Sequence, residues 1–276
     1  MKKWLSYPYF IWSIIFIVFP LALVLFFSFT ESVNGSYVFT LANYKRFMEP
    51  MYQGILWKSV WLALKATVVC LILGYPMAMI LGKMDPKKRG TLVLLLVLPM
   101  WMNFLLRTYA WVTILRGNGV LNMILGAIGL PEINILYTDV AVMLGMVYNF
   151  LPFMILPIYT VLSKMDNSLV EAATDLGANK VQTFIKVIFP LSLPGVISGI
   201  TMVFMPAVST FVISRLLGGG KYQLIGNLVE QQFVGVGNWH FGSAMSVVMM
   251  IFILISMGIM HRFDKDGEGK GGGRLW

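Results

Sequence analysis

The side chains that most often carry catalysis are few in this sequence and are not grouped. Glu171 and Asp175 stand four residues apart, a spacing that puts two carboxylates on one helix face, where they could share a proton or a metal ion. The two histidines, His240 and His261, lie far from this pair, and the one cysteine, Cys70, lies in an apolar run. A carboxylate near a helix N-terminus also has a purely structural use, because it interacts favourably with the helix dipole. The sequence therefore does not indicate an enzyme.

Nucleotide binding is not indicated either. The phosphate-binding pattern G-x4-G-K-[ST] does not occur. Gly218-Gly-Gly-Lys221 is glycine-rich but lacks that spacing, and it is typical of a turn. Any ATP-driven step would need another chain.

The composition indicates a membrane protein that crosses the bilayer several times. Hydrophobic residues make up 58% of the 276 residues and charged residues 12%, and the mean hydropathy is +0.79. Soluble domains carry about 25% charged residues, so one water-soluble core would not accommodate this chain. The net charge of +9 then reports which loops face the cytoplasm, and it does not point to nucleic acid.

Six apolar stretches are long enough to span a bilayer, which takes about 20 helical residues. We expect an all-α membrane protein with six transmembrane helices at 8–30, 59–82, 91–115, 140–162, 192–217 and 241–260. Lys2 and Lys3 precede the first stretch as in a signal peptide, but its apolar run is too long and no small-residue cleavage site follows. Residues 1–263 are expected to form one transmembrane domain, and 264–276, rich in glycine and charge, are expected to be a disordered cytoplasmic tail.

Lysine and arginine counts predict the orientation. Most loop Lys and Arg residues fall on the side of the N-terminus, so both termini are expected in the cytoplasm. Lys65, Arg107 and Arg215 remain inside or at the end of spans. Their charges either extend to the lipid headgroups or line a water-filled outer vestibule, and both interpretations stay open.

The loop 164–190 has the pattern of a folded unit. Ser168 and Glu171 have the spacing of a capping box, and Gly177 suits the left-handed position after a helix. Asn179 is placed to cap a second short helix that Pro190 would close. That helix would show one apolar face, formed by Val181, Phe184, Ile185 and Ile188. A structured cytoplasmic loop of this kind is a candidate docking site for a soluble partner.

The same loop resembles the EAA loop of ABC importer permeases. Glu171-Ala172-Ala173, three residues, Gly177, nine residues and Val187-Ile-Phe-Pro190 follow the pattern EAA-x3-G-x9-I-x-L-P, with conservative changes at Val187 and Phe189. The resemblance implies a type I ABC importer permease fold with a two-helix coupling loop at 164–190. It also implies that Glu171, Ala172, Ala173, Gly177 and Pro190 couple this chain to two ATPase subunits, which bind the ATP and Mg²⁺, while this chain binds no cofactor itself.

Most of the chain resembles the spermidine/putrescine permease subunits. The similar stretches are 103–109, 151–157, 171–190, 217–221 and 224–227. The resemblance implies a polyamine permease in the bacterial inner membrane, embedded in lipid. It also implies a second, non-identical permease and an extracytoplasmic binding protein as partners, and no nucleic acid.

Candidate substrate-path residues are aromatic or charged, and all except Arg215 lie in or near the third and fourth spans. Aromatic faces attract ammonium groups, each contact being worth about 0.5–2 kcal/mol. The candidates are Trp101, Arg107, Tyr109, Asp139, Tyr148, Phe153 and Arg215. Each aromatic could instead belong to a lipid-facing belt. Arg215 stands where related permeases often have an acid, and a base there would repel a polycation. A metal, oxyanion, thiamine or amino acid therefore stays open as an alternative substrate, and a stand-alone channel or secondary transporter as an alternative class.

Overall fold

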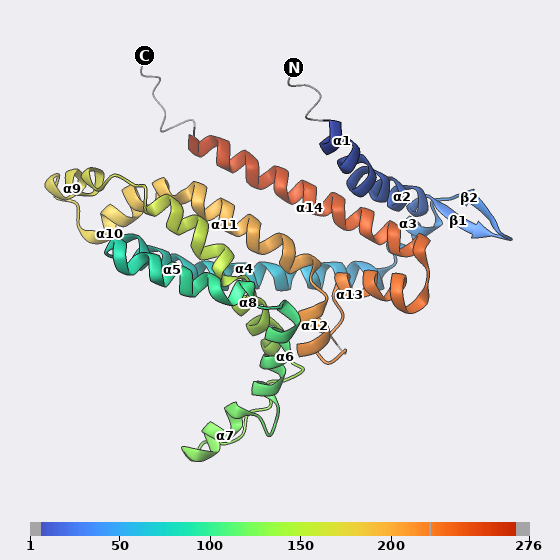
Figure 1. Ribbon diagram of the computed structural model, residues 1–276, viewed down its shortest axis with the longest axis horizontal. Helices are drawn as coiled ribbons and strands as arrows, with labels where there is room; N and C mark the ends of the chain where they lie inside the picture. Colours follow the sequence, from blue (N-terminus) through green and yellow to red (C-terminus); the bar gives the residue numbers. More distant parts are fainter. Residues whose placement is uncertain (1–6, 221, 269–276) are drawn as a thin grey trace.

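The computed structural model describes residues 7–220 and 222–268 (Figure 1). Five helices in this part are long and apolar enough to cross a membrane, and a sixth span is possible if one bent helix pair counts as one. This agrees with the six expected spans. Lys2, Lys3 and Lys221 lie outside the described residues.

The described residues are mostly helical, with one short hairpin and three π-helical turns, labelled η. The elements in order are α1 (Tyr7–Ser13), η2 (Ile14–Val18), α2 (Phe19–Ser28), β1 (Thr30–Val33), β2 (Ser36–Phe39), α3 (Ala42–Phe47), α4 (Pro50–Lys83), α5 (Pro86–Trp101), α6 (Phe104–Leu115), α7 (Val120–Ala127), α8 (Asp139–Leu162), α9 (Asn167–Asp175), α10 (Lys180–Thr183), η3 (Phe184–Ile188), α11 (Phe189–Ser209), α12 (Val212–Leu217), α13 (Ile225–Glu230), η4 (Gln231–Val236) and α14 (Trp239–Glu268).

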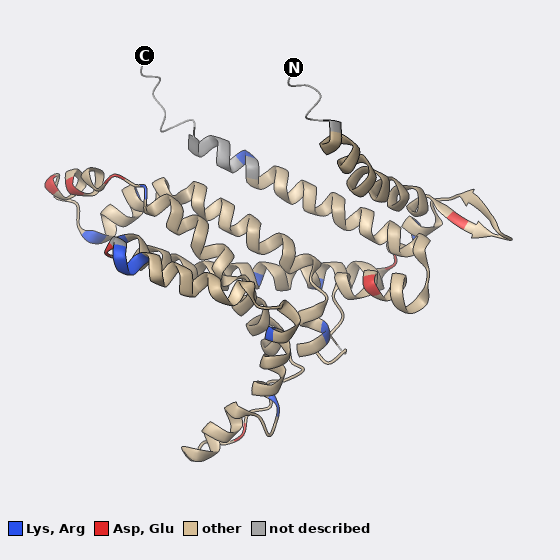
Figure 2. Cartoon of the chain, viewed as in Figure 1, with Lys and Arg blue, Asp and Glu red and all other residues tan. Residues whose placement is uncertain are grey.

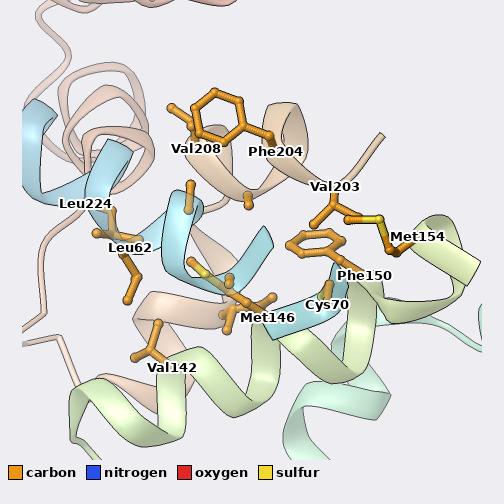
Figure 3. Close-up of a cluster of buried hydrophobic side chains, with 14 of the residues drawn as sticks. Leu62, Cys70, Val142, Met146, Phe150, Met154, Val203, Phe204, Val208 and Leu224 are labelled. Carbon is orange, nitrogen blue, oxygen red and sulfur yellow. The ribbon is translucent and has the colours of Figure 1, made fainter. Parts of the chain in front are cut away.

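The core lies where α8 packs against both α4 and α11. α14 packs against α11 and α2 (Figure 1). Cys70, Met146, Met154 and Val203 are among its buried side chains (Figure 3). α11 approaches α8 closely at Gly195 and Gly199, which stand four residues apart. A Cβ at Gly199 would lie 3.1 Å from the Met154 carbonyl oxygen of α8. Small residues thus let the two helix backbones approach each other.

The two ends of the helix bundle differ. One end, called the loop end below, consists of α9, α10, the last turns of α4 and α8, and the first turns of α5 (Figure 1). The other, called the hairpin end, carries β1, β2, α3 and α13 (Figure 1). The β1–β2 hairpin was not expected, although its turn signal, Asn34-Gly35, is in the sequence. Both turn residues have positive φ, 51° and 80°, as a two-residue hairpin turn requires.

The third span was expected as one helix over 91–115, and the structure corrects this. α5 ends at Trp101, α6 begins at Phe104, and the chain bends by 91° between them. Asn103 causes the restart, because its side-chain oxygen accepts hydrogen bonds from the backbone N–H groups of Leu105 and Leu106, at 2.8 and 3.4 Å.

The fifth span was expected over 192–217, with Pro190 closing the helix before it, and this was wrong at both ends. Helix runs without a break from Lys180 to Ser209, with Pro190 inside it. The π-helical turn η3 makes this possible, because the Phe189 N–H bonds to the carbonyl of Phe184 and the ladder shifts before the proline. The far end breaks at Thr210, so Arg215 lies on the separate helix α12.

The expectation of disorder over 264–276 is wrong for the first part of that segment. α14 continues to Glu268 and so includes the first residues of that segment. The remainder, 269–276, lies outside the described residues.

Candidate functional site

The loop 164–190 contains the two helix starts that the sequence predicts, but the second helix continues into α11 and a different residue begins the first. Asp166, and not Ser168, is the N-cap of α9, and its carboxylate accepts a hydrogen bond from the Ser168 N–H at 2.9 Å. This contact lowers the pKa of Asp166. Ser168 lies inside the first turn because the chain becomes helical at Asn167.

The connection from α9 to α10 is confirmed as predicted. Gly177 has φ +82°, the left-handed conformation that favours glycine. The N–H of Ala178 bonds to the Ala173 carbonyl and that of Gly177 to the Thr174 carbonyl, which completes a Schellman motif. Asn179 and Gln182 then form a reciprocal capping box at the start of α10. These bonds fix the angle between the two segments.

Several apolar side chains of this loop are exposed. Leu176 is 89% exposed, and Leu169, Val181 and Ile185 are exposed as well. The apolar face expected to fold onto the membrane domain is therefore only partly buried, because Ile188 is its one fully buried member. Apolar side chains in water favour contact with another surface.

The carboxylates of α9 are also free of partners in the structure. Glu171 and Asp175 are exposed and form no ion pair among the described residues. Ala172 is exposed and Ala173 half-buried. α9 thus presents two acids, small residues and apolar side chains on one projecting segment (Figure 2).

Tyr75 links this loop to the core, and the sequence analysis missed it. Its side chain on α4 is 7% exposed, and its hydroxyl lies 2.8 Å from the Ser192 hydroxyl on α11. Its ring packs edge-on against Phe184 of η3, with centroids 5.7 Å apart. A tyrosine inside an apolar span was the available signal, because a buried phenol needs a hydrogen-bond partner.

The aromatic candidates for the substrate path do not form one site. Trp101 is 75% exposed at the end of α5, and Tyr109 is exposed on α6. Tyr148 stacks edge-on with Trp111 at 5.3 Å, beside a cavity of about 370 Å³. Phe153 lines a different cavity, of about 520 Å³, between α8 and α11.

Arg107 is buried, with 9% of its surface exposed, and its Nε atom has no hydrogen-bond partner in the described part of the chain. The guanidinium lies 5.9 Å from the Phe104 ring centroid. An intramembrane charge in this state requires an acceptor from outside this subunit or water. Lys65, by contrast, is exposed, and its ammonium lies 5.5 Å from the Trp61 ring.

Arg215 is not a free cation. Its guanidinium pairs with the Glu230 carboxylate at 2.6 Å, joining α12 to α13. Asn227 of α13 strengthens the same junction, accepting from the Ser214 hydroxyl at 2.6 Å and donating to the Phe211 carbonyl at 2.9 Å. The positive charge that would repel a polycation is therefore compensated locally.

Asp139 begins α8 beside a buried tyrosine. Burial and the neighbouring Asp139 carboxylate raise the pKa of Tyr222 to about 12. On the Tyr222 ring face, the Lys58 ammonium lies 3.8 Å from the centroid. An aromatic face thus already holds an alkylammonium group, which is one of the contacts by which proteins bind amines.

Comparisons with known proteins identify this architecture. Residues 1–266 match the family described as binding-protein-dependent transport system inner membrane component. The spermidine/putrescine transport system permease protein PotB of Haemophilus influenzae is 42% identical over 261 residues, covering 93% of this chain and 91% of the relative. PotB of Escherichia coli is 43% identical over 255 residues, covering 90% and 91%.

Solved structures show the same fold. A bacterial ABC transporter that imports the acidic polysaccharide alginate matches with a TM-score of 0.77 at 16% identity, over 95% of this chain and 96% of that one. The MetNI methionine ABC transporter in an inward-facing conformation matches with a TM-score of 0.55 at 18% identity, over 79% and 98%. The fold is that of a type I ABC importer permease. The chain therefore belongs to the inner membrane components of binding-protein-dependent transport systems.

Proposed function

We propose that this chain is a permease subunit of an ATP-driven importer for polyamines. The observation that carries the transport mechanism is the projecting, capped α9 with unpartnered apolar and acidic side chains. The substrate assignment is supported by the relatives more than 40% identical, which are spermidine/putrescine permeases.

In this proposal α9 docks in a cleft of a separate ATPase chain, with the loop end in the cytoplasm. Glu171 provides a charged contact there, and Ala172 and Ala173 let the ATPase surface come close. Gly177 holds the turn, and Pro190 lies in the helix that receives the movement. The ATPase pair binds ATP and Mg²⁺, and its closure displaces α9.

The displacement travels along one continuous helical segment. α10, η3 and α11 run without a break from Lys180 to Ser209. Tyr75 ties the same segment to α4 through Ser192, so α4 and α11 move together. The core helices then open toward the outside, where a binding protein delivers substrate to this permease and a second, non-identical one.

Charge at the hairpin end is compatible with a polycation. The pairing of Arg215 with Glu230 removes the main objection from the sequence. Asp139, together with the aromatic rings of Trp101, Tyr109, Tyr148 and Phe153, provides candidate contacts for ammonium groups. Arg107 would take its missing acceptor from the second permease or from water.

The experiment is uptake of labelled spermidine by cells lacking polyamine import that express the complete transporter. We expect labelled spermidine to be taken up. Unlabelled putrescine should reduce this uptake by competition, whereas molybdate, thiamine and amino acids should not. A complex that assembles and hydrolyses ATP but imports none of the label would contradict the substrate assignment.

A further inference from the structure

A cavity of about 380 Å³ lies at the loop end, where four helix termini meet. Its charged groups are Lys83, from the last turn of α4, and Arg89, from the first turns of α5. Ser163, after α8, and Asn167, at the start of α9, add neutral polar groups. Met79 and Leu162 belong to the apolar part of the lining. The cavity therefore combines a cationic rim with an apolar wall.

The two cations have no ion-pair partner in the part of the chain that the structure describes. The ion pair found among the described residues is Arg215–Glu230, and it involves neither Lys83 nor Arg89. Neither the Lys83 ammonium nor the Arg89 guanidinium donates a hydrogen bond within that part of the chain. Lys87 and Lys88 lie in the same stretch, so residues 83–89 carry four basic side chains against one acid, Asp85, and are net positive (Figure 2). Neighbouring like charges raise the free energy of this region unless an anion enters it.

We propose that this cavity binds the phosphate of an anionic phospholipid headgroup, with Lys83 and Arg89 as its ligands. Arginine presents two parallel N–H groups to phosphate oxygens, and lysine adds a point charge. The site lies where α4 and α8 leave the apolar region, so a headgroup could enter while its acyl chains stay in the bilayer. Basic pockets between helix ends on the cytoplasmic side suit such headgroups.

Occupancy would act on α9. Asn167 and Val170 of α9 form part of the cavity wall, whereas α9 has no buried residue of its own. A bound headgroup would therefore restrain the segment that we assign to ATPase coupling. This consequence depends on the proposed function and orientation, whereas lipid binding itself is measured independently of transport.

The test uses the complete transporter in bilayer nanodiscs of phosphatidylcholine with phosphatidylglycerol. Native mass spectrometry measures how much phosphatidylglycerol the complex retains. The pocket variant is Lys83→Gln with Arg89→Gln, and the matched control is Lys87→Gln with Lys88→Gln, which removes the same charge outside the cavity lining. We expect the pocket variant to lose retention about 30-fold, since each of the two basic groups contributes about 1 kcal/mol to anionic lipid binding. The control should stay near wild type.

Two further arms make the result decisive. The variant Lys83→Arg with Arg89→Lys keeps both charges and should keep the lipid, which separates loss of binding from loss of folding. Equal losses in the pocket and control variants would overturn the site in favour of general surface charge. In pure phosphatidylcholine nanodiscs, millimolar inorganic phosphate should not replace the lipid as a bound species. Phosphate bound with similar strength would overturn the lipid assignment and indicate a free-anion site.

Discussion

Removing the contact between Tyr75 and Ser192 tests how α4 is joined to the helix that carries the loop. The Ser192 hydroxyl donates to the Phe189 carbonyl at 2.8 Å. Its one proton is thereby used, so the Tyr75 hydroxyl must be the donor in the 2.8 Å contact between the two side chains. The structure therefore predicts unequal costs for the two deletions.

Tyr75→Phe leaves Ser192 with its donor still satisfied, so the cost should be near the membrane average of about 0.6 kcal/mol per side-chain hydrogen bond. Ser192→Ala leaves a buried phenol without an acceptor, which costs about 1–3 kcal/mol. The double variant should be less destabilised than Ser192→Ala alone, because no donor is then left unpaired.

The assay is unfolding of the purified transporter in mixed micelles by titration with SDS, followed by circular dichroism. The ratio of substrate imported to ATP hydrolysed is measured in parallel and should fall in both single variants. A Tyr75→Phe cost equal to or above that of Ser192→Ala would refute the assigned direction of the hydrogen bond. An unchanged ratio of substrate imported to ATP hydrolysed in both single variants would refute the proposal that this contact makes α4 and α11 move together.

Four other predictions follow from named contacts. Asp166→Ala should speed amide exchange in the first turn of α9, because it removes the N-cap. The folded-state pKa of Asp166 is lowered, so in wild type the cap should stabilise the helix above about pH 4 and lose this effect as pH falls through the lowered pKa. Amide exchange measured across pH reports this change. Gly177→Ala forces a Cβ into φ +82° and should cost about 1 kcal/mol, seen as faster exchange after α9 without loss of the spans. Gly199→Ala should destabilise the transporter by about 1–3 kcal/mol because its Cβ would meet the Met154 backbone, whereas Gly258→Ala, where the Cβ meets open space, should be neutral or stabilising in a thermal melt. Glu230→Gln should reduce spermidine uptake by leaving the Arg215 charge uncompensated, and adding Arg215→Gln should restore it; no restoration would show that repulsion is not the cause.

The spans were predictable because they depend on composition averaged over many residues. The stretches 140–162 and 241–260 match α8 and the membrane part of α14 closely. Gly177 and Asn179 were also predictable, because their roles follow from local backbone chemistry.

The errors occurred where a single residue decides the geometry. Asn103 restarts a helix inside an apolar run, and hydropathy does not register a cap of this kind. Pro190 was expected to end a helix, but a π-helical turn before it absorbs the missing donor. Asp166 is two residues before Ser168, and both suit an N-cap by type, so only the backbone decides between them.

The loop 164–190 of the candidate site was predictable from sequence, whereas the arrangement of the candidate substrate-path residues was not. The residues that we propose for ATPase coupling share one contiguous segment, so their proximity follows from sequence. The path residues come from α5, α6, α8 and α12, and their separation depends on the 91° bend and on the break before α12. Tyr75 and Tyr222 were missed because their partners lie more than 80 residues away along the chain, at Ser192 and Asp139 respectively.

The most direct measurement compares Glu171→Lys with Asp175→Lys in the complete transporter. Both residues are exposed acids on α9, and both variants change charge equally. ATP hydrolysis stimulated by the loaded binding protein, and spermidine uptake, are measured together with ATPase co-purification. The account predicts that Glu171→Lys abolishes stimulation and uptake while Asp175→Lys keeps most of both. Full coupling in Glu171→Lys, with the ATPase still bound, would contradict the central claim.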